Sequence, residues 1–199
     1  MTTSFSAPSS PSLRPLGVVL LVWGIAALLV AVSGVLASVP VPPPALAILF
    51  AGLVLVTYAV SPGIRARLNA VPMRALVAIH LLRIFAGANF LRLSAQGTLP
   101  VDFALPAGIG DVAVGLAAGL VLFFALPVEQ PRQRTAVLVW NTLGLIDILA
   151  VLANGARYAI AEPSLILPFT KLPLAMLPLF VVPLVIVSHV LVFVRLRRS

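Results

Sequence analysis

The sequence predicts an all-α fold, a polytopic transmembrane helical bundle of six spans with both termini cytoplasmic. Of its 199 residues, 61% are hydrophobic and only 9% are charged, whereas soluble domains carry about 25% charged residues. The mean hydropathy is +1.18. The apolar residues are gathered into runs near the ~20 residues that a helix needs to cross a ~30 Å hydrocarbon core. Together these observations predict an integral membrane protein.

The N-terminal third predicts a tail and a helical hairpin. Residues 1–13 are rich in Ser, Thr and Pro, so we expect a disordered N-terminal tail before a single transmembrane helical domain over 14–199. The first span is expected over 16–38, because its apolar run is longer than that of a signal peptide. Prolines at 40 and 42–44 end this helix and favour a new start, which predicts a second span over 45–61.

The remaining four spans lie between short polar segments. Residues 62–72 are expected to form a loop, 128–134 a charged link and 155–172 a longer connection. The fourth span is expected to carry Pro106 in its first turn, where proline is tolerated. The predicted spans cover 73–93, 105–127, 135–154 and 173–194.

The distribution of Lys and Arg predicts the orientation. Cytoplasmic loops carry an excess of these residues. With the N-terminus inside, nine fall on the cytoplasmic side (Arg14, Arg65, Arg67, Arg74, Arg132, Arg134, Arg195, Arg197, Arg198) and three outside (Arg92, Arg157, Lys171). The net charge of +8 therefore sets topology beside an anionic lipid bilayer, and no nucleic-acid partner is expected. The absence of cysteine excludes disulfides and thiolate chemistry.

The third span carries a charge that needs a partner inside the membrane. A guanidinium near the bilayer centre costs about 2.5 kcal/mol or more unless hydrogen-bond acceptors or an opposite charge pair with it. Depth along each helix places Arg83, Asp147 and Asp111 near the midplane or outward of it, with Asn89 toward the outer face. Asp147 is the expected ion-pair partner of Arg83, and Asp111 the second. An alternative has Asp111 as a capping or first-turn carboxylate.

These four residues define a predicted polar core. If both acids meet the one base, one carboxyl group is able to carry a proton, which would make this a substrate or proton site. The alternative is a structural pair that only fixes which helices meet.

A second polar group is expected in the inner leaflet. His80, His189 and Asn141 lie at similar depth on three different spans. Two histidines on facing helices have the geometry for bis-imidazole ligation of one haem b. The alternative is that they only form hydrogen bonds, with no cofactor. We expect no metal site.

Glycines and prolines predict packing and bending. Gly115 and Gly119 form a small-residue face suited to close helix approach, and they favour a homodimer across this face. Gly108 and Gly110 are expected to let the fourth span break as transporter helices do. Pro178 and Pro183 are expected to make the last span irregular, because each interior proline frees a backbone carbonyl.

Four sequence segments carry a family resemblance: HLLRIFAGANFL, GTLPVDFALPAGIGDV, WNTLGLIDILA and the proline-rich last span. With them, residues 75–190 resemble an uncharacterised group of small bacterial multi-span membrane proteins. The resemblance implies six helices and the inner (cytoplasmic) membrane of a bacterium. It implies no activity.

Three functions therefore remain open. The first is a small-solute or proton-coupled transporter centred on Arg83, Asp111 and Asp147. The second is a haem electron carrier or membrane enzyme that uses His80 and His189. The third is an accessory or structural membrane subunit, working with a partner subunit, in which the polar groups only fix helix pairing. No nucleotide-binding, serine-hydrolase or zinc-protease motif is present, and the loops are too short to form a soluble catalytic domain.

Overall fold

A computed structural model describes residues 12–198, and this part of the chain contains helices and no strands. The predicted tail over 1–13 lies outside the described residues except for Ser12 and Leu13. Six helical segments are long and apolar enough to cross a membrane, which confirms the all-α multi-span fold. They are Arg14–Ser33, Pro43–Val60, Met73–Ala95, Val101–Ala125, Pro131–Ala161 and Leu177–Arg198.

These segments are built from eight α-helices and five shorter helical turns. The α-helices are α1 (Arg14–Ser33), α2 (Pro43–Val60), α3 (Pro62–Ala70), α4 (Met73–Ala78), α5 (Leu82–Ala95), α6 (Val101–Leu120), α7 (Pro131–Ala161) and α8 (Val182–Arg198). Three turns are 3-10 helices, η1 (Val35–Ser38), η2 (Ile79–Leu81) and η4 (Pro163–Thr170), and two are π-helical, η3 (Val121–Ala125) and η5 (Leu177–Val181).

Two expected loops are helical because their sequences supply helix starts. Residues 62–70 form α3, which Pro62 begins and the Ser61 hydroxyl caps by accepting from the Ile64 N–H. The link at 131–134 is the first turn of α7, where the Gln133 side chain accepts from the backbone N–H of Gln130. The predictions of a loop and of a charged link were wrong at these two places.

The fourth span begins earlier than predicted. Pro100 holds an extended backbone and precedes α6, which starts at Val101 and runs through Pro106. Pro106 therefore lies inside the helix and not in its first turn. Pro106 cannot donate to the carbonyl of Asp102, four residues earlier, and that oxygen instead accepts from Asn154 Nδ2 at 3.3 Å. Asp102 itself occupies the first turn, where a carboxylate is favoured by the helix dipole.

The last span is irregular at the expected prolines, and one freed carbonyl is received by α1. It opens with the π-helical turn η5, which contains Pro178, and continues into α8, whose second residue is Pro183. Pro183 cannot donate to the carbonyl four residues earlier, at Leu179. The indole Nε1 of Trp23, on α1, donates to that oxygen at 2.9 Å. The proline thus creates the acceptor that anchors α1.

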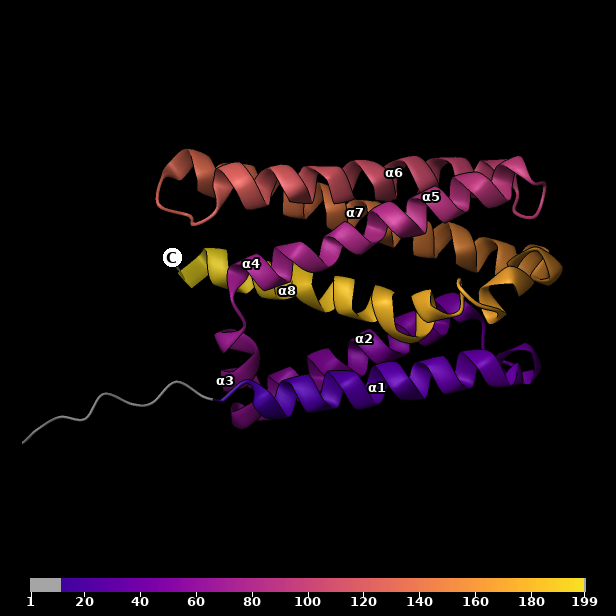
Figure 1. The fold of residues 1–199 in the computed structure, drawn as a ribbon, viewed down its shortest axis with the longest axis horizontal. Helices are drawn as coiled ribbons and strands as arrows, with labels where there is room; N and C mark the ends of the chain where they lie inside the picture. Colours follow the sequence, from indigo (N-terminus) through magenta and orange to yellow (C-terminus); the bar gives the residue numbers. More distant parts are fainter. Residues whose placement is uncertain (1–11, 199) are drawn as a thin grey trace, which may run out of the picture.

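The helices form a bundle in which α8 lies between two groups (Figure 1). On one side are α5, α6 and α7, and on the other are α1 and α2. The start of α1, α3, the α6–α7 connection and the C-terminus share one end of the molecule, the basic end, which carries the nine basic residues named above. Arg92 in the last turn of α5, Arg157 near the end of α7 and Lys171 after η4 lie toward the opposite end.

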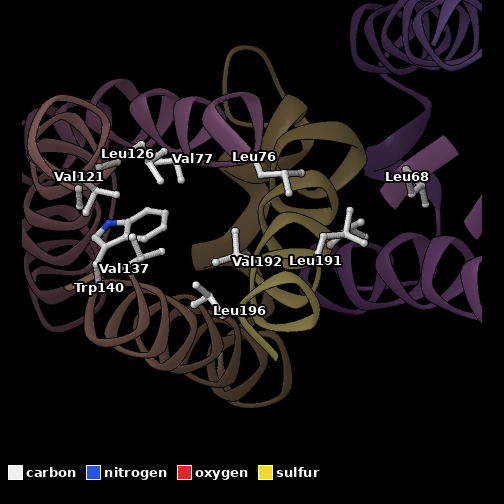
Figure 2. Close-up of a cluster of buried hydrophobic side chains, with 13 residues drawn as sticks. Leu68, Leu76, Val77, Val121, Leu126, Val137, Trp140, Leu191, Val192 and Leu196 are labelled. Carbon is white, nitrogen blue, oxygen red and sulfur yellow. The ribbon is translucent and has the colours of Figure 1, made fainter. Parts of the chain in front are cut away.

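Apolar side chains gather at the basic end of the bundle. Figure 2 shows this cluster, in which residues from α3, α4, α7 and α8 converge with the end of the fourth span. Its members include Leu68, Leu76, Val77, Val121, Leu126, Val137, Trp140, Leu191, Val192 and Leu196. A second cluster of aromatic residues, centred on Phe90 and Phe103, fills the opposite end. The polar residues of interest lie between the two clusters.

Helix α1 is the most peripheral of the spans. Only Ala27 and Ala31 are buried along it, and most of its other side chains face outward. Trp23 packs edge-on against Phe180 of η5, with 5.3 Å between ring centroids. Its attachment is therefore concentrated around Trp23, Ala27 and Ala31.

Loss of the indole donor is expected to loosen α1. The Trp23→Phe variant keeps the ring but leaves the Leu179 carbonyl unpaired, so we expect a loss of about 0.6–2 kcal/mol in the free energy of unfolding. Titration of the purified protein with a denaturing detergent measures it. Ser33→Ala is the control, because the Ser33 hydroxyl makes only local bonds, donating to the Val30 carbonyl and accepting from the Val35 N–H. Equal stability of the two variants would show that the hydrogen bond from Trp23 to the Leu179 carbonyl does not anchor α1.

Candidate functional site

Arg83 is the centre of the buried polar core. It lies on α5 and is 2% exposed. Its Nε donates to Asp111 Oδ1 at 2.6 Å, its Nη1 donates to the Gly144 carbonyl at 3.0 Å, and its Nη2 donates to Asp147 Oδ2. Three nitrogens of the guanidinium are therefore received by three acceptors on α6 and α7, the fixed fork geometry that suits arginine.

The two carboxylates differ in their surroundings. Asp111 lies in the middle of α6, eleventh in the helix and 3% exposed, so it is not a capping residue. The Asp147 side chain is 24% exposed. The structure thus places both acids on one base.

Two glycines let the charged groups approach each other. A Cβ on Gly110 would collide with Asp147 Oδ1, and a Cβ on Gly144 would come within 2.8 Å of His189 Cε1. Helix α6 runs without interruption through Gly108 and Gly110, so the expected helix break is not formed. Gly110 instead makes room for the Asp147 carboxylate.

The other glycines of α6 pack it against α5. A Cβ on Gly108 would lie 2.7 Å from Leu91 Cγ, and one on Gly115 would lie 2.6 Å from Ile84 Cγ1. A Cβ on Gly119 would meet only Leu81, at 3.9 Å. Gly115 therefore packs helices of the same chain, the close approach that small residues allow. The homodimer stays a prediction.

Asn89 lies apart from this cluster. Its Nδ2 donates to the Phe85 carbonyl at 2.9 Å and its Oδ1 accepts from Arg92 at 3.1 Å. These bonds stay on its own helix. The predicted four-residue polar core is therefore three residues in the structure, with the Gly144 carbonyl as the fourth partner.

The two histidines form a second buried group. The rings of His80 and His189, both 0% exposed, are 4.2 Å apart between centroids. His80 Nε2 is 2.9 Å from Ser188 Oγ, and His189 Nδ1 is 2.8 Å from Asn141 Oδ1. Trp140 closes the group, with its ring 4.9 Å from that of His80.

The hydrogen bonds of the neighbours fix which ring nitrogens carry hydrogen. The Ser188 hydroxyl donates to the Val185 carbonyl and the Asn141 amide donates to the His189 carbonyl. Each neighbouring oxygen is therefore an acceptor, so His80 Nε2 and His189 Nδ1 are the donors. The remaining ring nitrogens, His80 Nδ1 and His189 Nε2, are buried. Each carries a lone pair that has no hydrogen-bond partner among the described residues.

Gly144 joins the two polar groups. Its carbonyl accepts from Arg83, and its Cα lies against the imidazole of His189. His80 also lies three residues before Arg83, one turn away along the same span. The two groups, which depth along the helices separates, are thus adjacent in the structure and meet at Gly144.

Two cavities flank this core. One of about 50 Å³ reaches Arg83 and Asp111 and extends toward the opposite end between Phe90, Phe103 and Phe169. It has room for a few waters. The other, of about 580 Å³, lies toward the basic end and reaches Ser188. The polar core therefore lies between the two cavities and separates them.

The described residues hold no group of three or more His, Cys, Asp or Glu side chains arranged to bind a metal ion. Two imidazoles that ligate one haem iron bond it from opposite faces of the macrocycle. Here the two rings are in direct contact with each other. This arrangement does not fit a haem between them.

Sequence reasoning missed Gly144 and the contact of Trp140 with His80. A glycine three residues before Asp147 and a tryptophan next to Asn141 were the available signals. Neither shows which way its helix is rotated.

The fold and this core belong to a polytopic helical membrane protein. A family model described as a domain of unknown function, DUF8737, matches residues 41–197, and the chain belongs to that family. Comparison with curated proteins gave no match, and comparison with solved structures gave none either.

Adding a methyl group at Gly144 is expected to disrupt the core. The Gly144→Ala variant places Cβ within 3.0 Å of Val114 Cγ1 as well as against His189. We expect a loss of about 1–3 kcal/mol in the free energy of unfolding, the usual cost of overpacking. Gly52→Ala is the matched control, because nothing lies within 4 Å of that Cβ. If both variants unfold alike, Gly144 does not hold this contact.

Proposed function

We propose that the protein is a small proton-coupled carrier whose proton-binding site is the cluster of Arg83, Asp111 and Asp147. One observation carries the proposal: two carboxylates, from α6 and α7, meet one buried guanidinium. A pair that only joined helices would need one carboxylate.

The charge balance supports a bound proton. One guanidinium and two ionised carboxylates leave an excess negative charge between transmembrane helices, where uncompensated charge is costly. A proton on either carboxyl makes the cluster neutral. Since both acids contact the same base, the proton belongs to the pair and is shared between them.

The histidine group supplies acceptors toward the basic end. His80 Nδ1 and His189 Nε2 are lone pairs without a donor, and Gly144 links His189 to Arg83. Ser188 bonds His80 and lines the larger cavity. This series of polar groups leads from the carboxylates on one side to the larger cavity on the other.

The smaller cavity supplies access from the opposite end. Arg83 and Asp111 line it together with Pro178 and Val181 of the π-helical turn η5. Irregular turns of this kind occur at functional positions in helices. We propose that movement of η5 changes the access of water or a small solute to the carboxylates.

We also propose that the chain lies in the cytoplasmic membrane of a bacterium with both termini inside. The support is the excess of basic residues at the basic end, nine against three at the opposite end. Orientation in this sense puts the smaller cavity on the outward side and the larger one on the cytoplasmic side.

A second candidate is a structural subunit. Its support is the saturation of Arg83: its three bonds link α5 to both α6 and α7, so the cluster can serve only to fix helix pairing. Haem ligation is not proposed, because the two imidazoles contact each other.

Infrared difference spectroscopy of the purified protein in lipid tests for the bound proton. We expect wild type to show the carbonyl stretch of one protonated carboxyl at neutral pH, because the cluster is otherwise left with an excess charge. Asp111→Asn and Asp147→Asn should each remove this band, since one acid then balances Arg83 and stays ionised.

The control is Asp102→Asn, which removes an exposed carboxylate from the same helix as Asp111. It should leave the band unchanged. Absence of the band from wild type would reject the proton site. A band that persists in both cluster variants would also reject it. If the Asp147→Asn protein is folded and stable but shows no proton uptake into liposomes, the protein is a carrier and the cluster is more than a structural pair.

The orientation can be tested by labelling, because the chain has no cysteine of its own. We expect Thr98→Cys, in the α5–α6 connection at the opposite end, to react with a membrane-impermeant maleimide on intact cells. Glu129→Cys, in the α6–α7 connection at the basic end, should react only after permeabilisation. The reverse pattern would place the termini outside.

A further inference from the structure

The larger cavity is apolar and opens partly to the outside. It has a volume of about 580 Å³ and is lined by residues of α1, α2, α3, α4, η2 and α8. Its walls include Leu16 and Leu20 of α1, Val54 of α2, Leu76 of α4, and Leu184 and Leu191 of α8. Packed protein interiors have few voids larger than a water molecule, and an apolar space of this size suits a ligand of drug-like dimensions.

The cavity exists because α1 is attached only along part of its length. Trp23, Ala27 and Ala31 hold α1 against the rest of the bundle, with the Trp23 indole bonded to the Leu179 carbonyl. Toward the basic end, Leu16 and Leu20 face α8 and α4 across the cavity. An apolar, flexible occupant fits between them, and the surrounding membrane supplies acyl chains.

One cation marks the headgroup end of the cavity. Arg67, on α3, lines the cavity and is half-buried. The structure gives its guanidinium no hydrogen bond or ion pair with a described residue, whereas neighbouring Arg65 donates to the carbonyls of Tyr58 and Ala59. Glu129 is the one acid among the residues at this end. The charge at the mouth therefore complements an anion.

We propose that this cavity binds one anionic phospholipid, with an acyl chain between α1 and α8 and the phosphate at Arg67. The apolar walls match an acyl chain, and Arg67 at one end of the cavity matches an anionic headgroup. An acyl chain there would lie against Ser188, whose hydroxyl is bonded to His80. The lipid would thus contact the polar core from the basic end. This site does not depend on the proposed proton-carrier function.

Native mass spectrometry of the full chain tests the lipid site. Delipidated protein in a non-ionic detergent is incubated with palmitoyl-oleoyl phosphatidylglycerol or with the corresponding phosphatidylcholine. We expect one retained phosphatidylglycerol, held about tenfold more tightly than phosphatidylcholine, which corresponds to about 1.4 kcal/mol. No retained lipid, or equal retention of the two, would overturn the proposal.

Two pairs of variants locate the site. Arg67→Gln should remove the preference for phosphatidylglycerol, whereas Arg74→Gln, which removes an exposed charge at the same end, should keep it. Val54→Trp fills the cavity and should abolish retention of both lipids, whereas Leu49→Trp, on the outward face of α2 with Leu49 52% exposed, should not.

Loss of the preference in both arginine variants would indicate general charge attraction and overturn the assignment to Arg67. Retention in the Val54→Trp variant would show lipid bound on the outer surface only. If Val54→Trp does not fold, Leu20→Trp fills the same cavity from the α1 wall and gives the same readout.

Discussion

The burial of the Arg83 charge is the constraint on which the arrangement of α5, α6 and α7 depends. A guanidinium that is 2% exposed among apolar helices is tolerated only when its donors are received. Its acceptors lie on α6 and α7, so both helices must approach α5 and each other closely. Gly110 admits the Asp147 carboxylate, and Gly144 admits His189 while offering its carbonyl to Arg83. The glycines of these helices therefore allow close packing around the ion pair and His189, more than they allow the helices to bend.

The number and order of the spans could be predicted from the sequence, because apolar runs of membrane-crossing length leave few alternatives. The boundaries could not, since they are set by local capping. Gln130 and Gln133 start α7 four residues before the expected position, and Pro100 starts α6 before Pro106. The helix α3 was missed because its polar sequence carries a short helix start and no apolar run, so hydropathy does not detect it.

Depth along the helices placed Arg83 and Asp147 near the midplane and Asp111 outward of them, and that part of the cluster was accessible from sequence. Rotation about the helix axis was not. Asn89 lies six residues after Arg83, about 240° around the helix. It therefore bonds within its own helix, to the Phe85 carbonyl and to Arg92. The link through Gly144 is a backbone carbonyl, which no side-chain pattern reveals. For the same reason the two histidines were treated as a separate group, although one glycine joins them to the arginine.

The position of α1 outside the family match has a topological consequence. Residues 41–197 contain five of the six membrane-crossing segments. An odd number of crossings leaves the two ends of that domain on opposite sides of the bilayer, and α1 is the crossing that returns the N-terminal side of the chain to the C-terminal side. Of the nine basic residues at the basic end, only Arg14 precedes the domain. Seven of the nine lie within residues 41–197, so the difference in charge between the two ends is a property of the domain itself.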